Sequence, residues 1–177
     1  RPGQLSDETL GNLLKAMGLK PAQSEKRYDF QFRSVNDGEE WDLSMTAVLS
    51  SDSESIWVMA WLDDLPKSAA DVPRTALLRL LAANDRLGKG KFFAYVASNR
   101  RFVLQRVVKN ETISTRSFAE VLKDLGGSVI ETYPYWSTAN WSSGSTSNVA
   151  EGGASSLEGA GKSPARTAAA PTGTTIQ

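Results

Sequence analysis

The 177-residue sequence contains no cysteine and no histidine. Without cysteine there is no disulfide framework, no thiolate nucleophile, no Fe–S cluster and no cysteine-based zinc site. Without histidine, the commonest metal ligand and the commonest general base are both missing. These two absences favour a protein that is not an enzyme. We therefore expect no catalytic, metal-binding or cofactor-binding residues, and carboxylates are the only remaining route to acid–base chemistry.

Long apolar runs are also missing. A membrane-spanning helix needs about 20 predominantly apolar residues, and no run in this sequence approaches that length. The N-terminus has no signal-peptide pattern, and we expect no membrane partner. The chain opens at Arg1 rather than Met, which leads us to expect a fragment or a processed product.

The formal net charge is zero, but the charges are unevenly arranged. Residues 29–71 hold ten acidic and two basic residues, whereas residues 72–116 hold ten basic and two acidic ones. A sheet built from both segments would carry opposite charge on its two sides. We expect a mixture of cross-strand ion pairs and an electrostatically guided self-contact.

The composition changes after residue 136. Of the 41 residues in 137–177, 30 are Ser, Thr, Gly, Ala or Pro. Such a segment has too little apolar surface to offset the entropy lost on ordering, so we expect a disordered tail over 137–177. One α+β domain is expected over residues 5–136.

Hydrophobic spacing predicts eight elements within that domain. A helix capped by Ser6 carries Leu10 to Met17 at helical spacing, and a second helix starts at Pro73 with Asp71 expected as its cap. A third helix follows Ser114 or Thr115, with Gly126-Gly127 as a site for a kink or an early end. The strands are expected at 28–33, 41–49, 56–62, 91–96 and 101–108. The predicted order is α-β-β-β-α-β-β-α, with a twisted antiparallel sheet and helices on one face.

The third strand is apolar on both faces. Ile56, Val58, Ala60 and Leu62 alternate with Trp57, Met59 and Trp61. Two interpretations remain open, because such a strand is either central and covered within the chain or has one face covered by a partner.

Short motifs give weaker signals. The segment Lys89 to Val96 partly resembles the RNA-binding RNP1 pattern, but Lys91 occupies the position of its first aromatic residue. Gly88-Lys89-Gly90-Lys91 lacks the spacing of a phosphate-binding P-loop. The carboxylates that could pair lie at turns or on polar strand faces, where solvated acids are common, and they are Asp29, Asp42, Glu54, Asp63 and Asp64. Nucleic acid is therefore not expected as a partner, and RNA or small-ligand binding is kept as a minor alternative.

A family resemblance lies in the element order and in the segments Trp57 to Leu62, Leu77 to Leu81, Asn84-Asp85 and Phe92 to Tyr95. In these features the chain resembles the type III secretion chaperone-like superfamily, which includes CesT/Tir chaperones and YbjN-like proteins. The resemblance implies a cytoplasmic bacterial protein that forms a homodimer and holds an extended segment of an unidentified partner protein or peptide. It implies partner contact through Trp57, Met59 and Trp61. Dimerisation would use the second helix and the strand after it, through Leu77, Leu80, Leu81, Phe93 and Tyr95. A YbjN-like regulatory or signalling domain is the alternative.

Overall fold

The computed structural model describes residues 3–141 of the chain. The sheet of this α+β fold contains β1 (Ala22–Ser24), β2 (Arg27–Asn36), β3 (Glu39–Leu49), β4 (Ser55–Asp64), β5 (Lys91–Val96) and β6 (Arg101–Lys109). The α-helices are α1 (Asp7–Ala16), α2 (Arg74–Leu87), α3 (Thr115–Glu131), α4 (Tyr133–Trp136) and α5 (Thr138–Trp141), and two short 3-10 turns lie at η1 (Ala69–Asp71) and η2 (Ala97–Asn99). None of the described helices is long and apolar enough to cross a membrane.

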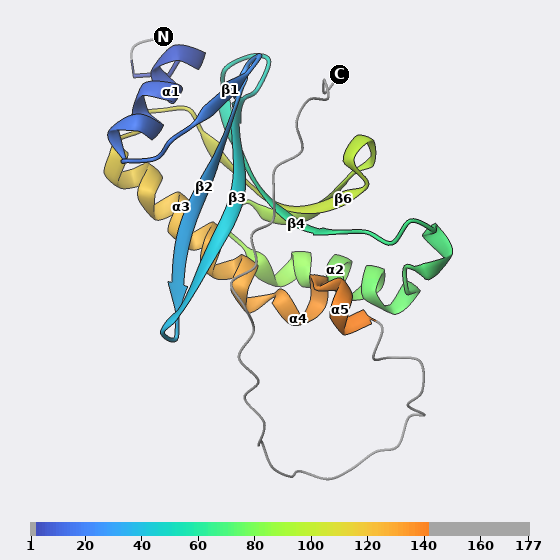
Figure 1. Cartoon of the computed structure of the whole chain (residues 1–177). Helices are drawn as coiled ribbons and strands as arrows, with labels where there is room; N and C mark the ends of the chain where they lie inside the picture. The colour runs from blue at the N-terminus through green and yellow to red at the C-terminus, as the bar shows by residue number, and fades with distance from the viewer. Residues whose placement is uncertain (1–2, 142–177) are drawn as a thin grey trace.

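The six strands form one antiparallel sheet in the order β1-β2-β3-β4-β6-β5. In Figure 1, β2 and β3 run steeply through the molecule while β4 and β6 bend away from them, so the sheet is strongly twisted. The predicted α+β order is confirmed, and the structure adds the short strand β1 and the short helices α4 and α5. β4 lies between β3 and β6, and this central position agrees with the first of the two interpretations of its apolar sequence.

All the longer helices pack on one face of the sheet, here called the inner face. Alternating residues of the strands point to it, among them Phe30, Met45, Val58 and Leu104, and they form one core with apolar residues of α1, α2 and α3. This confirms the expectation of helices on one face. The opposite face, called the outer face, carries Trp57, Met59 and Trp61.

Helix α3 passes without interruption through the two glycines at which a kink was considered. A Cβ added at Gly126 would lie 3.0 Å from Ser34 Oγ and 3.2 Å from Ser34 Cβ, whereas one at Gly127 would meet nothing within 4 Å. Gly126 therefore allows α3 to lie close against β2, and Gly127 has no such role in the packing.

The helix starts follow local chemistry, with one correction. Ser6 and Ser114 each accept the backbone N–H of the residue three positions on, as N-caps do. The prediction that Asp71 caps α2 was wrong, because Asp71 ends the short turn η1 and α2 begins after Pro73. Val72 precedes the proline and is extended, as pre-proline residues usually are, so it separates Asp71 from the helix.

The described chain continues beyond Trp136. Ser137 is buried, and α5 follows at residues 138–141, where Thr138 N–H lies 3.2 Å from Asp63 Oδ2. Residues 142–177 of the expected tail lie outside the described residues.

Candidate functional site

An apolar groove of about 480 Å³ lies between α2 and the β5–β6 hairpin. All five residues predicted for dimerisation line it, namely Leu77, Leu80, Leu81, Phe93 and Tyr95. They come together because Leu77, Leu80 and Leu81 recur at helical spacing, while Phe93 and Tyr95 share one face of β5. The structure thus brings residues from two separate segments into one site.

These five residues have different roles in the groove. Leu80 and Phe93 form its floor, because they are only 2% and 6% exposed and belong to the main core. Leu81 and Tyr95 form its rim, with 63% and 51% of their surface exposed. Burial of large apolar side chains is favourable by about 1.5–3 kcal/mol each, so the rim residues are those that gain from a partner.

The far wall of the groove comes from the segment after β4. Leu65, Pro66 and Val72 line it, and Phe102 of β6 packs against Tyr95 with 5.6 Å between ring centroids. Arg100 fixes this wall by donating to the backbone oxygens of Pro66, at 2.7 Å, and Lys67. The wall is therefore held to the tip of the β5–β6 hairpin.

Sequence reasoning missed several residues of this site. Leu78 does not line the groove but is 65% exposed on α2 beside the groove residue Leu77, and the Leu77-Leu78 pair was a visible signal for an apolar surface that extends beyond the groove. Leu65 and Arg100 join the groove only through the fold, because Leu65 directly follows β4, Arg100 lies in the turn before β6, and no periodic pattern marks either residue.

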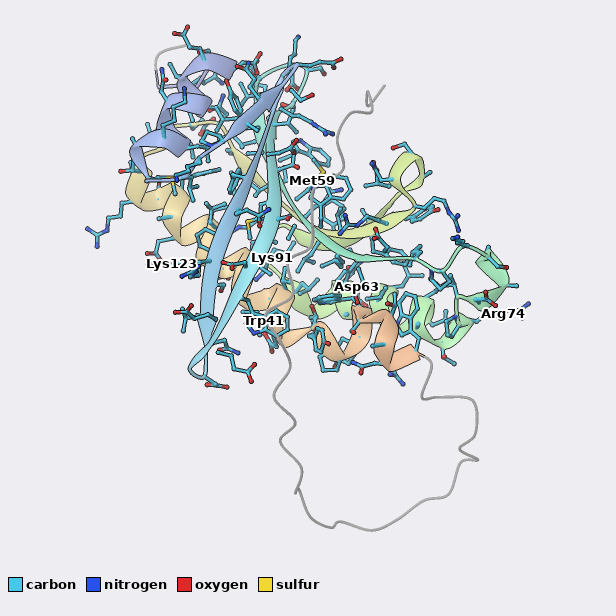
Figure 2. All side chains as sticks on the ribbon, in the orientation of Figure 1. Trp41, Met59, Asp63, Arg74, Lys91 and Lys123 are labelled. Carbon is cyan, nitrogen blue, oxygen red and sulfur yellow. The ribbon has the colours of Figure 1, made fainter. Side chains whose placement is uncertain are left out.

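The three residues predicted for partner contact lie on the outer face but are not equally accessible. Met59 and Trp61 are 5% and 3% exposed and form a small cluster with Val103. Trp57 is half-buried and packs edge-to-face against Phe92, with ring centroids 6.4 Å apart. Met59 is labelled in Figure 2. Of the three, Trp57 is the side chain that a partner could reach without displacing others.

Polar side chains connect the outer face across three strands. Trp61 Nε1 donates to Thr46 Oγ1 at 2.8 Å, and Thr46 Oγ1 donates to Asp29 Oδ1 at 2.5 Å. Arg101 stacks over the Trp61 ring, with its guanidinium carbon 5.6 Å from the ring centroid. Burial lowers the pKa of Arg101, while Asp64 and Asp63 act in the opposite direction. Because a buried indole N–H usually finds a partner, these contacts fix the orientation of Trp61.

A charge cluster on the inner face was not predicted. Asp124 of α3 lies 2.6 Å from Arg106 Nη1, 3.0 Å from Lys91 Nζ and 3.4 Å from Lys89 Nζ. Lys91 also donates to Ser128 Oγ at 2.7 Å. Burial raises the pKa of Asp124, but the hydrogen bond and charge of Lys91, together with Arg106 and Lys89, outweigh it and hold the pKa below its ordinary value.

Five basic residues in or next to the β5–β6 hairpin form contacts within the chain. Lys89, Lys91 and Arg106 pair with Asp124, and Arg100 binds backbone oxygens of the groove wall. Arg101 donates to the backbone oxygen of Leu62 and lies 3.2 Å from Asp64. These internal contacts account for residues that the RNA-binding alternative would have assigned to phosphate.

Cross-strand ion pairs are present, as the charge pattern led us to expect. Arg33 lies directly opposite Asp42 in the β2–β3 ladder, with 3.1 Å between Nε and Oδ1, and also pairs with Glu40. The Arg101–Asp64 pair joins the acidic segment to the basic one. The Arg33 pairs are exposed, and exposed ion pairs contribute about 0.2–1 kcal/mol each.

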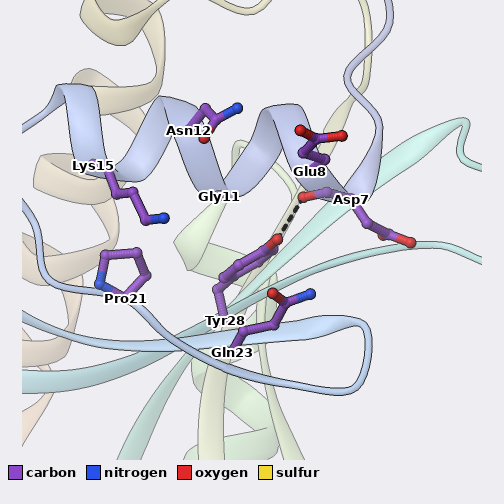
Figure 3. A pocket seen from close by; sticks show the side chains of 8 residues that line it. All are labelled: Asp7, Glu8, Gly11, Asn12, Lys15, Pro21, Gln23 and Tyr28. Atoms are coloured by element: carbon purple, nitrogen blue, oxygen red, sulfur yellow. Dashed lines mark hydrogen bonds between the residues drawn. The ribbon is translucent and has the colours of Figure 1, made fainter.

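A second hollow of about 450 Å³ lies between α1 and the start of the sheet (Figure 3). Tyr28 crosses it and donates its hydroxyl to the backbone oxygen of Asp7 at 2.8 Å. A Cβ at Gly11 would lie 2.7 Å from the Tyr28 ring, so the glycine is needed for this close approach. The arrangement holds α1 to β2 and provides no set of catalytic groups. Among residues 3–141, no group of three or more His, Cys, Asp or Glu side chains could hold a metal ion.

The sequence matches no protein-family model and no curated protein. Several solved structures are similar to the chain at low identity, including the following three. A chain of the HopA1-SchA chaperone–effector complex is 12% identical over 68% of this chain and 86% of its own, with a TM-score of 0.47. A chain of the ExsC-ExsE complex is 12% identical over 73% and 92%, with a TM-score of 0.49.

The third is a chain of the heterodimeric ExoU-SpcU complex from the type III secretion system of Pseudomonas aeruginosa, 17% identical over 71% of this chain and 96% of its own, with a TM-score of 0.43. The resemblance expected from the sequence is therefore found again among solved structures.

Proposed function

We propose that this chain is a non-enzymatic, chaperone-like protein-binding module that acts as a homodimer and holds a segment of a partner protein. The observation that carries the proposal is the groove between α2 and β5, where an apolar floor is bordered by the exposed Leu81 and Tyr95. Exposed apolar surface around a formed groove is typical of a protein–protein contact.

A second copy of the chain is the proposed occupant of this groove. In a two-fold dimer the same patch meets itself, so an apolar helix beside an apolar groove on one copy supplies both halves of the contact. Helix α2 has 14 residues and is roughly 20 Å long, and Leu78 and Leu81 are exposed along it. The opposite charges of residues 29–71 and 72–116 would guide the approach, an effect that salt screens.

The partner segment is proposed to lie on the sheet rather than in the groove. β1 pairs with β2 only from Arg27 to Asp29, and no described strand pairs with that edge of β2 from Phe30 to Asn36. A free strand edge accepts an extended segment through backbone hydrogen bonds. Trp57 is the proposed aromatic contact on the outer face, with Met59 and Trp61 packed beside it.

Light scattering on the full chain after size exclusion tests the dimer. We expect a mass of about twice 19.2 kDa at micromolar concentration, and a weaker dimer as salt rises. Leu81→Asp should give a monomer, because it places a charge on the rim of the groove. Val35→Asp is the matched control, since Val35 and Leu81 are both 63% exposed but Val35 lies at the far end of β2. A wild-type mass of 19.2 kDa at all concentrations would refute the dimer.

Partner binding is tested by affinity capture with the wild type and with Trp57→Ala. We expect a protein partner whose recovery falls in the variant, because Trp57 is more accessible than Met59 and Trp61 on the outer face. Co-purifying nucleic acid that survives this substitution would instead favour the RNA-binding alternative. A stable complex with signalling proteins that is equally strong in both forms would favour the YbjN-like regulatory alternative.

A further inference from the structure

We propose that Asn84 closes the free edge of β5 against strand addition. β5 is the last strand of the sheet, and Asn84 of α2 lies beside it. Asn84 Oδ1 accepts the backbone N–H of Phe93 at 2.7 Å, and Asn84 Nδ2 donates to the backbone oxygen of Phe93 at 3.5 Å. One side-chain amide thus takes both backbone groups that a neighbouring strand would use at this residue.

The direction of these bonds shows which backbone groups face the free edge. In an antiparallel sheet, successive residues alternate between pointing their N–H and C=O toward one neighbour and toward the other. The N–H and C=O groups of Phe93 point away from β6. The same groups of Lys91 and Tyr95, two residues before and after it, therefore also point away from β6. Lys91 N–H is already bonded to the oxygen of Gly88 at 3.0 Å. A strand approaching β5 would therefore find only Tyr95 with both groups available, and would have to displace Asn84 to pair with Phe93.

The sequence of β5 explains why such protection matters. Lys-Phe-Phe-Ala-Tyr-Val is rich in aromatic and β-branched residues, and an unprotected edge of this composition is a template for another strand. The proposed dimer would bring two such edges near one another. With Asn84 in place, a second copy in the groove is held by side-chain contacts and not by backbone pairing to β5. The contact therefore stays a closed dimer. Naming the second copy as the occupant of the groove depends on the proposed function, but the closure of β5 by Asn84 does not.

The two edges of the sheet would then have separate uses. The β2 edge from Phe30 to Asn36 has no described strand beside it and stays open for an extended segment. The β5 edge is closed at its middle, so the groove accepts side chains of a helix. Asn84 thereby acts as a specificity residue that keeps an extended partner away from the dimer surface.

The test compares Asn84→Ala with Asn12→Ala, an exposed asparagine on α1, in the full chain. Amide hydrogen exchange followed by NMR should show the protection of Phe93 N–H falling by about tenfold or more in Asn84→Ala, since one hydrogen bond is lost. The N–H of Ala94 points to β6 and should keep its protection. Light scattering should show species larger than a dimer for Asn84→Ala and none for Asn12→Ala.

Two further variants separate this inference from the proposed dimer. In a Leu81→Asp background the groove contact is removed, and adding Asn84→Ala should restore association, now through β5. Asn84→Asp keeps an oxygen acceptor for Phe93 N–H and should leave the mass unchanged. If Phe93 loses protection while the mass stays the same in both backgrounds, the closing role of Asn84 is wrong. If Leu81→Asp alone remains dimeric, the groove dimer is wrong and the comparison at Asn84 still stands.

Discussion

Lys91 of β5 and Asp124 of α3 meet on the inner face of the sheet, with 3.0 Å between Lys91 Nζ and Asp124 Oδ2. The Lys91 side chain is only 6% exposed (labelled in Figure 2). Arg106 and Lys89 bind the same carboxylate, so one anion on α3 neutralises part of a three-cation group on the edge hairpin. This hairpin also forms one wall of the groove, and the ion cluster therefore fixes the groove's position relative to the core.

Asp124→Asn should destabilise the fold strongly. It removes the negative charge and leaves Lys91 buried beside two other cations, and breaking a buried ion pair in this way costs about 3 kcal/mol or more. Urea unfolding measures the change in the free energy of unfolding. Glu120→Gln is the matched control on the same helix, because the Glu120–Lys123 pair is exposed and its loss should cost less than about 0.5 kcal/mol. Equal effects of the two substitutions would contradict a stabilising cluster.

The contribution of Asp124 should depend on pH in one direction. Its pKa is lower in the folded protein than the ordinary value of 3.8, so the folded state favours the ionised carboxylate. The stabilisation is complete above the ordinary pKa and is lost as the pH falls through the lower pKa of the folded state. The difference in unfolding free energy between wild type and Asp124→Asn should therefore be constant near pH 7 and shrink in acid. A difference that grows on acidification would contradict this assignment.

The two adjacent glycines of α3 should respond differently to alanine. Gly127→Ala meets no atom within 4 Å and should stabilise the protein by about 0.5–1 kcal/mol, because alanine favours the helix. Gly126→Ala places a Cβ 3.0 Å from Ser34 Oγ, and the crowding should make it at least about 1 kcal/mol less stable than Gly127→Ala. Thermal unfolding of both variants measures the difference, and equal stabilities would show that α3 does not lie so close to β2.

Substitution of Trp61 should lower the stability of the fold more than substitution of Trp57. Trp61→Ala removes a 3% exposed ring and its hydrogen bond to Thr46, and should cost about 3–5 kcal/mol of stability. Trp57→Ala should cost less, because that ring is half-buried. Urea unfolding monitored by circular dichroism measures the free energy of unfolding of both variants. If Trp61→Ala unfolds like the wild type, the outer face is looser than the structure shows.

The sequence led to the correct element order because each element has a local signature. Tyr28, Phe30 and Phe32 alternate with polar residues on β2, and the leucines of α1 recur at helical spacing, so each segment shows which side it buries. The grouping of Leu80 with Phe93 as dimerisation residues came from the family resemblance, and the structure places both in the groove. The resemblance did not separate floor from rim, because exposure depends on how far α2 diverges from β5, which no local pattern records.

The resemblance drawn from the sequence grouped Trp57, Met59 and Trp61 as one contact surface, whereas the structure separates an accessible Trp57 from buried neighbours. Their alternation on β4 was readable, but their burial depends on the Thr46 and Arg101 side chains that register and twist bring beside them. Whether this surface binds a partner remains a prediction.

By itself, the sequence determined which side α1, α3 and β2 bury and that β4 is apolar on both faces, since those periods follow from backbone geometry alone. Only the tertiary structure decided that Asp124 would meet Lys91, that Asn84 would bind the backbone of Phe93, and that Leu81 would face a groove. The physical reason is that these contacts join a strand to a helix that lies elsewhere in the chain. Their distances are set by the twist of the sheet and the packing of the helices on it, which short-range spacing does not encode.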